Sequence, residues 1–169
     1  MRLYLLRHAE AVPHAAPGFA RDADRPLTEH GIKQARGVAA GLQALKIELD
    51  LVLVSPYVRA QQTAAQVLEA YSRIEHRELP ELRPEETPRA ASLALKAFAE
   101  RRHVLCVGHN PHLSLWLAEL ITTTGELQVE FKKAAVACVE LSHVPPARGA
   151  AVLRWMMTPK QLSTLGEPA

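Results

Sequence analysis

The chain has few aromatic residues, few cysteines and no long apolar run. Aromatic residues make up 5% of its 169 positions, too few for a platform on which nucleic-acid bases stack. Its 20 basic and 18 acidic residues nearly balance, so composition gives no support for a nucleic-acid or membrane surface. No apolar stretch reaches the roughly 20 residues needed to cross a bilayer. We therefore predict neither a nucleic-acid partner nor a membrane partner.

Other absences narrow the class of protein further. Only two cysteines occur, Cys106 and Cys138, and each lies inside an apolar run, which favours buried thiols over a disulfide. The N-terminal apolar run is too short for a signal peptide, so the predicted location is cytoplasmic. The sequence has no glycine-rich loop of the kinds that bind ATP, GTP or NAD. We predict no cofactor.

Apolar runs alternate with longer amphipathic segments along the chain. The length suits one compact domain, and no repeat or linker interrupts it, so we predict a single domain over residues 1–169. Apolar runs predict strands, and apolar residues three or four positions apart predict helices. The predicted strands are 2–8, 50–55, 74–78, 103–109, 134–141 and 150–157. The predicted helices are 28–46, 56–71, 89–101 and 111–121.

This order of elements predicts an α/β fold. Repeated strand–helix units with uniformly apolar strands are typical of a mainly parallel sheet that is covered on both faces. The last two strands follow one another without a helix, which predicts an antiparallel hairpin at the sheet edge. The expected architecture is a three-layer α/β/α sandwich with a mainly parallel central sheet and an antiparallel edge.

Unusual residues stand at the ends of three long apolar runs. His8 closes the first run, Ser55 the second, and His109 the run that starts at His103. In an open α/β sheet, ligands bind beyond the carboxyl ends of the strands. We therefore expect these side chains to meet at one edge of the sheet.

Two of these ends are followed at once by a predicted helix. In Ser55-Pro56 and Asn110-Pro111, the pattern is typical of an N-cap residue before a proline at the first helical position. Such helix starts bind phosphate or carboxylate readily. Arg59 lies in the first turn of one of these helices, where a cation opposes the helix dipole. Its unfavourable position indicates a role with a ligand.

The residue types at this edge favour phosphoryl transfer. Arg7 and His8 stand side by side where an unpartnered buried charge would be costly, so an anionic ligand in a shared pocket would account for both. Guanidinium groups such as those of Arg7 and Arg59 match phosphate oxygens. A neutral imidazole can attack phosphorus and carry the group covalently, and nearby cations keep it neutral by lowering its pKa.

The same motifs resemble those of a known family, the histidine phosphatase superfamily. The stretch "LLRHAE" is similar to its N-terminal Arg-His signature, with Ala9 in place of the usual glycine. The stretch "SPYVRAQQTA" is similar to the element that carries the downstream arginine, here Arg59. The stretch "VGHNP" is similar to the second-histidine element, here His109. The stretch "RPLTEHGIKQA", which begins at Arg25, resembles the segment leading into the first long helix.

Within that superfamily the chain most resembles the SixA-like branch. Its short length, the stretch "LPEL" and the ending "LRWMMTPKQL" carry this likeness. The branch consists of phosphohistidine phosphatases that act on phosphorylated histidine-containing signalling domains. The resemblance implies a phosphoglycerate-mutase-like fold, a hydrolase activity and a phosphorylated protein as partner.

The resemblance also implies roles for individual residues. His8 would be the nucleophile and would form a phosphohistidine intermediate. The phosphoryl oxygens would be held by Arg7, Arg59 and His109, with Arg25 as a further contact. Ser55 and Asn110 would add polar or backbone contacts, although helix capping explains both equally well.

A general acid is harder to assign. Larger superfamily members use a loop carboxylate to protonate the leaving group, and Glu81 is the nearest match, with Glu85 and Glu86 as rivals. Each is better explained as a solvated loop carboxylate. The SixA-like branch is generally short of an effective acid, which fits a phosphohistidine that can leave as neutral imidazole.

Three functions stay open at this point. The first is a SixA-like phosphohistidine phosphatase, and the second is a phosphatase or mutase for small phosphate esters. The third is a phosphate-binding module without turnover. A metal site is not expected, because His109 and His112 have no third ligand at a suitable spacing. Lys132 and Lys133 are predicted to be a solvated pair that could steer an acidic partner.

Overall fold

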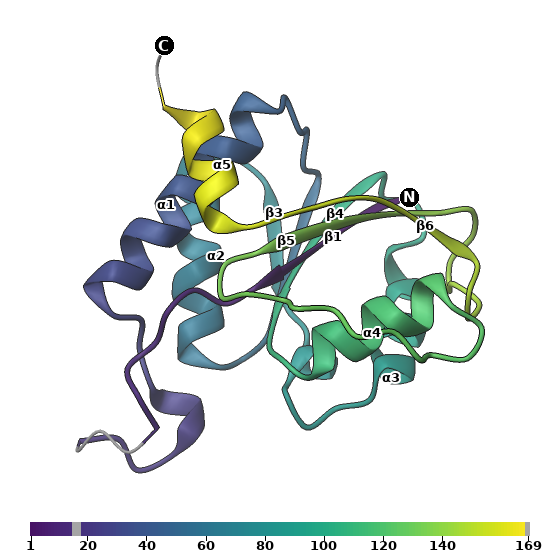
Figure 1. Cartoon of the computed structure of the whole chain (residues 1–169), viewed down its shortest axis with the longest axis horizontal. Helices are drawn as coiled ribbons and strands as arrows, with labels where there is room; N and C mark the ends of the chain where they lie inside the picture. The colour runs from purple at the N-terminus through teal and green to yellow at the C-terminus, as the bar shows by residue number, and fades with distance from the viewer. Residues whose placement is uncertain (15–17, 168–169) are drawn as a thin grey trace.

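The computed structural model of the chain describes residues 1–14 and 18–167 and is built on one six-stranded sheet (Figure 1). The strands are β1 (Arg2–Arg7), β2 (Leu51–Val54), β3 (Glu75–Glu78), β4 (His103–Gly108), β5 (Val136–Leu141) and β6 (Ala151–Met157). They lie in the order β3-β2-β4-β1-β5-β6. The first four in this order run parallel, while β5 is antiparallel to both of its neighbours. The predicted mainly parallel sheet with an antiparallel edge is confirmed.

Helices cover both faces of this sheet. The α-helices are α1 (Glu29–Ala44), α2 (Val58–Ala70), α3 (Pro88–Ala94), α4 (His112–Ile121) and α5 (Pro159–Gly166). Three short 3₁₀ helices also occur, η1 (Asp22–Asp24), η2 (Pro80–Leu82) and η3 (Leu95–Phe98). Helices α1, α2 and α5 pack on one face, and α3 and α4 pack on the other (Figure 1). This is the predicted three-layer sandwich.

Alternation along the strands supplies two separate apolar cores. In β1, Leu6 packs in the core beneath α1, α2 and α5, while its neighbour Leu5 packs in the core beneath α3 and α4. Cys138 belongs to the first core and Cys106 to the second, and both are buried free thiols, as predicted. Within residues 1–14 and 18–167, no helix combines the length and apolar character of a membrane span.

Two predicted elements need correction. The predicted helix over 89–101 is wrong in its second half, because α3 ends at Ala94 and the chain tightens into η3. The C-terminal helix α5 is missing from the predicted elements. Its signal is a capping box in which the Thr158 side chain accepts from the Gln161 backbone and the Gln161 side chain accepts from the Thr158 backbone. Eight residues are too few for the apolar period alone to reveal such a helix.

Close packing of α5 on α1 leads to a stability prediction. A methyl group at Gly41 would overlap the backbone carbonyl of Leu162, whereas one at Gly37 would overlap the rotatable hydroxyl of Ser163 and lie 3.1 Å from Ser163 Cβ. We expect Gly41→Ala to lower the free energy of unfolding by about 1–3 kcal/mol. Gly37→Ala should leave it unchanged or raise it, because alanine favours the helix by roughly 0.5–1 kcal/mol. Urea titration of both variants measures this, and equal effects would contradict the close approach.

Candidate active site

The carboxyl ends of β1 and β4 and the residues that follow β2 border one pocket of about 310 Å³. Parallel strands end at the same edge of a sheet, which explains why motifs far apart in sequence meet here. Six of the site residues predicted from the sequence line it. The lining residues are Arg7, His8, Ala11, Asp22, Arg25, Arg59, Pro84, His109, Asn110 and Lys133.

His8 is held in one tautomer at the base of this pocket. Its Nδ1 lies 2.7 Å from the carbonyl oxygen of Ala9, and a carbonyl only accepts, so Nδ1 carries the proton. Nε2 therefore carries a lone pair, to which Arg59 Nε donates at 3.2 Å. Burial, together with the charges of Arg59, Arg7 and Lys133, lowers the pKa of His8 from 6.5 to about 3. The ring is neutral at physiological pH, as a nitrogen nucleophile must be.

Thr63 fixes the backbone that orients this ring. The buried hydroxyl of Thr63 accepts from the Ala9 amide at 3.1 Å and donates to the Arg59 carbonyl at 2.7 Å. On the other side, the His8 amide donates to Gly108 of β4 at 2.9 Å. Helix α2 and strand β4 together therefore set the direction in which the imidazole points. The sequence gives Thr63 no evident role beyond its place in the arginine motif.

Asp22 is a residue of the pocket that sequence reasoning missed. Its carboxylate accepts from Arg59 Nη2 at 2.8 Å and from Arg25 Nε at 2.8 Å, and its backbone carbonyl accepts from Arg59 Nη1 at 2.7 Å. Burial by itself would raise the pKa of Asp22, but hydrogen bonds from His14, Arg25 and Arg59 outweigh it and hold the pKa well below its usual range. Asp22 is therefore an ionised partner of two arginines.

His109 faces His8 across the pocket. The two ring centroids are 5.1 Å apart. His109 Nε2 lies 2.8 Å from the Ser55 hydroxyl. Burial, with smaller contributions from His8 and Arg59, lowers the pKa of His109 to about 2. The second imidazole is thus a neutral hydrogen-bonding group.

The predicted capping roles of Ser55 and Asn110 are wrong. The N-cap residue of α2 is Tyr57, and the Ser55 hydroxyl contacts His109. The N-cap residue of α4 is Pro111, while the Asn110 amide donates to the Phe131 carbonyl at 3.3 Å. Neither is an N-cap residue: the Ser55 hydroxyl contacts His109 and also accepts weakly from the Tyr57 amide at 3.5 Å, just before α2, while Asn110 contacts the segment before β5.

Arg7 is anchored by the segment that precedes β5. Its Nη1 donates to the Phe131 carbonyl at 2.7 Å. Arg7 Nε is buried and has no hydrogen-bond partner among the described residues. The sequence also did not indicate that Lys133, from the same segment, would line the pocket.

No glutamate of the predicted acid set lines the pocket. Glu81 is half-buried on η2, and the Glu85 carboxylate accepts from the Tyr57 hydroxyl at 3.1 Å. Among the lining residues the carboxylate is Asp22, which is ionised and paired. The part of the chain that the structure describes contains no cluster of three metal-binding side chains.

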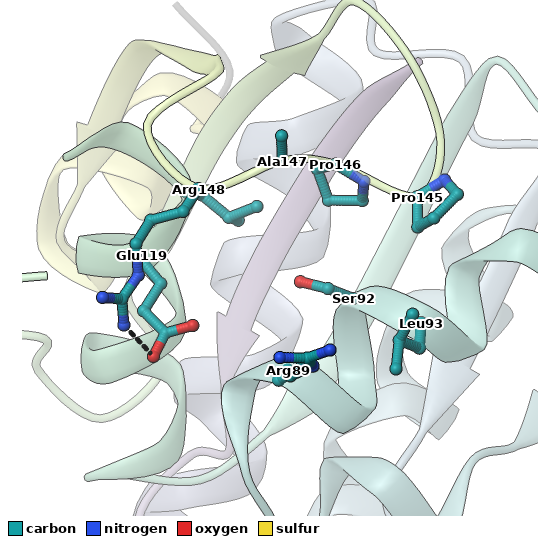
Figure 2. Close-up of a pocket in the computed structure, with 9 residues that line it drawn as sticks. Arg89, Ser92, Leu93, Glu119, Pro145, Pro146, Ala147 and Arg148 are labelled. Atoms are coloured by element: carbon teal, nitrogen blue, oxygen red, sulfur yellow. Dashed lines mark hydrogen bonds and ion pairs between the residues drawn. The ribbon is translucent and has the colours of Figure 1, made fainter. Parts of the chain in front are cut away.

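A larger cleft of about 550 Å³ lies elsewhere, between α3, α4 and the loop that joins β5 to β6 (Figure 2). An ion pair between Arg148 and Glu119, 2.7 Å apart, stands along one side of it. Prolines 145 and 146 face Arg89 across the cleft (Figure 2). None of the residues singled out from the sequence lines this cleft, whereas the predicted site residues gather at the smaller pocket.

The two neutral histidines give a pH prediction. In the unfolded chain, His8 and His109 take up protons below about pH 6.5, but in the folded chain their pKa values are about 3 and 2. The folded state should therefore lose stability as pH falls from 6.5, by about 2 kcal/mol per histidine between pH 7 and pH 5. Urea unfolding at both pH values measures the loss. It should shrink in a variant carrying His8→Gln and His109→Gln, and an undiminished loss would contradict the assignment.

Comparison with known proteins adds an independent line of evidence. The model of the Histidine phosphatase superfamily (branch 1) matches residues 3–87. Phosphohistidine phosphatase SixA of Escherichia coli K12 is 33% identical over 165 residues, which cover 96% of either chain. The solved structure of the protein histidine phosphatase SixA complexed with tungstate superposes with a TM-score of 0.82 at 33% identity, covering 96% of this chain and 99% of that one. A shorter similarity, 42% over 82 residues, joins 48% of this chain to 39% of the adenosylcobalamin/alpha-ribazole phosphatase of Salmonella typhi.

Proposed function

Because this chain belongs to the histidine phosphatase superfamily and is a phosphatase, we propose that it hydrolyses phosphohistidine on a protein substrate. The observation that carries the proposal is the neutral His8 ring, whose Nε2 lone pair faces a cationic pocket in which the lining carboxylate, Asp22, is ionised. The near full-length similarity to SixA supports this substrate class.

In this proposal the first step transfers the phosphoryl group to the enzyme. His8 Nε2 forms a bond to phosphorus while the bond from phosphorus to the substrate imidazole breaks. A substrate ring that carries a proton on its other nitrogen leaves as neutral imidazole. The transferring oxygens are held by Arg7, Arg59 and His109, with Arg25 as a further contact.

The second step regenerates the enzyme. Water attacks phosphorus, the bond to His8 Nε2 breaks, and inorganic phosphate leaves. Before the next turnover, the His8 ring must again carry its proton on Nδ1. The contacts of His8 Nδ1 with Ala9, and of Ala9 with Thr63, hold it there.

Two features favour phosphohistidine over small esters as the substrate. An alkoxide leaving group needs a proton donor, but the lining carboxylate, Asp22, is ionised between Arg25 and Arg59. In addition, the likeness to the adenosylcobalamin/alpha-ribazole phosphatase covers 48% of this chain, against 96% for SixA. Ester hydrolysis is the second candidate, and that shorter similarity is what favours it.

Phosphate release from two substrates tests the proposal. One is a histidine-containing phosphotransfer domain phosphorylated with phosphoramidate, and the other is a panel of sugar phosphates. We expect kcat/KM to be at least about 100-fold higher for the protein, with acid-labile phosphate on the enzyme during turnover. A higher kcat/KM for the sugar phosphates would instead identify small phosphate esters as the substrate class. Tight phosphate binding without any label on the enzyme would leave a binding module. The cytoplasmic location stays a prediction.

A further inference from the structure

Lys133 is a cation of the phosphate pocket that belongs to none of the predicted site motifs. It lines the pocket beside Arg7 and His8, and it also borders an adjoining recess of about 480 Å³. The two hollows share Arg7, Asn110 and Lys133. Lys133 thus lies between the phosphate pocket and the adjoining recess.

The backbone around Lys133 is tied directly to the nucleophile strand. The Ala134 amide lies 3.1 Å from the carbonyl of Arg7 and 3.2 Å from that of His8. The Arg7 amide in turn donates to Ala135 at 3.1 Å. Ala134 has a φ of +57°, in the left-handed region, which makes a tight turn immediately after Lys133. The lysine is therefore presented at a fixed point of the pocket wall.

Topology places Lys133 and Arg59 on opposite flanks of His8. In the sheet order β2-β4-β1-β5, Arg59 follows β2, and His8 follows β1. Lys133 precedes β5, on the far side of β1. Arg25 and Asp22 lie with Arg59 on the first flank. Among the described residues that line the pocket, Arg7 and Lys133 are the cations on the flank beside β5.

The charge of Lys133 is available to a ligand. Its neighbour Lys132 lies 3.7 Å from the Glu130 carboxylate. Lys133 forms no ion pair with any residue in 1–14 or 18–167. Lys133 is an exposed residue of the pocket lining, and its ammonium lies at the end of a flexible four-carbon stem. Its charge also acts on His8.

We propose that Lys133 is a further ligand of the phosphoryl group, binding an oxygen on the flank opposite Arg59. It would be a phosphate-binding residue of the phosphatase, and in this respect the inference rests on the proposed function. The three oxygens of a transferring phosphoryl group spread around the axis of attack. Lys133 and Arg7 on one flank would balance Arg25 and Arg59 on the other, where part of the charge is offset by Asp22.

The test compares Lys133→Ala with its neighbour Lys132→Ala. We expect Lys133→Ala to weaken tungstate binding by about fivefold to tenfold and to raise KM for the phosphorylated phosphotransfer domain by a similar factor. Its binding should also depend less steeply on salt. Lys133→Arg, which keeps the charge, should recover most of the affinity, whereas a merely structural role for Lys133 would not produce these effects.

The matched control decides the outcome. Lys132→Ala has the same change in net charge but removes a cation that lies 3.7 Å from the Glu130 carboxylate and does not line the phosphate pocket, so its affinity should stay within about twofold of the wild type. Equal tungstate affinities for the two alanine variants would overturn the role of Lys133. Because tungstate binding needs no phosphohistidine substrate, failure of the substrate assignment leaves this measurement intact. The two proposals can therefore fail separately.

Discussion

Replacing His8 with alanine should reduce turnover by about four orders of magnitude or more, because covalent catalysis loses its nucleophile. In the folded chain, the lone pair of His8 Nε2 faces the cationic pocket. The His8 ring is neutral because burial lowers its pKa to about 3. The second imidazole, His109, has its Nε2 2.8 Å from the Ser55 hydroxyl, and its proposed role is to bind a phosphoryl oxygen. Turnover of a phosphorylated phosphotransfer domain measures the loss, and acid-labile label on the enzyme should disappear with it.

The same variant should still bind an oxyanion. Arg7, Arg59 and Lys133 line the pocket independently of the imidazole ring, so tungstate affinity should change by less than about tenfold. His76→Ala removes an exposed histidine of β3 and serves as the control, with turnover unchanged. Substantial turnover in His8→Ala would remove His8 from the nucleophile role. Loss of both turnover and tungstate binding would instead indicate a collapsed pocket.

The meeting of His8, Arg59 and His109 could be predicted because it depends on local signals. Each lies where an apolar run ends or just after it, and parallel strands bring their carboxyl ends to one edge. Apolar runs that form parallel strands therefore place these three side chains at one edge of the sheet. The fold class could be predicted for the same reason, since alternation of apolar runs with helical patterns is a property of the sequence alone.

Asp22 and Lys133 could not be predicted in the same way. Asp22 lies on a three-residue 3₁₀ helix in the segment before α1, and Lys133 lies on an irregular segment before β5. Neither segment has an apolar period that fixes its path. Their positions come from long-range contacts: Asp22 pairs with Arg59, and Ala134, next to Lys133, bonds to the end of β1. Such contacts carry no local sequence signal.

The wrong capping predictions have a related cause. Ser and Asn before proline are favourable at helix starts, but their side chains serve equally well as partners inside a polar pocket. Ser55 bonds to His109, and Asn110 bonds to Phe131. A polar residue at a strand end therefore has two competing uses, and propensity does not distinguish between them.

Arg59→Ala is the second substitution from which we expect a large effect, a fall in kcat/KM of about a thousandfold. Arg59 is 4% exposed, and its guanidinium uses all three nitrogens: Nε donates to His8, while Nη1 and Nη2 donate to Asp22. Its loss removes both the contact that faces the attacking nitrogen and a proposed clamp on the phosphoryl oxygens. Arg59→Lys should recover little, because an ammonium cannot reproduce the planar fork.

Asp22→Ala distinguishes a catalytic role of Arg59 from a structural one. If Arg59 mattered only because it ties down the segment that carries Asp22, then Asp22→Ala would cost as much as Arg59→Ala. We expect Asp22→Ala to keep kcat/KM within about tenfold of the wild type, because it leaves the guanidinium free to bind phosphate and removes a competing carboxylate. Steady-state kinetics on both variants, with urea unfolding as a check on stability, measures the difference. An equal fall in kcat/KM in the two variants would contradict the catalytic role of Arg59. The guanidinium is still present in Asp22→Ala, so such a result would mean that Arg59 acts by holding the segment that carries Asp22.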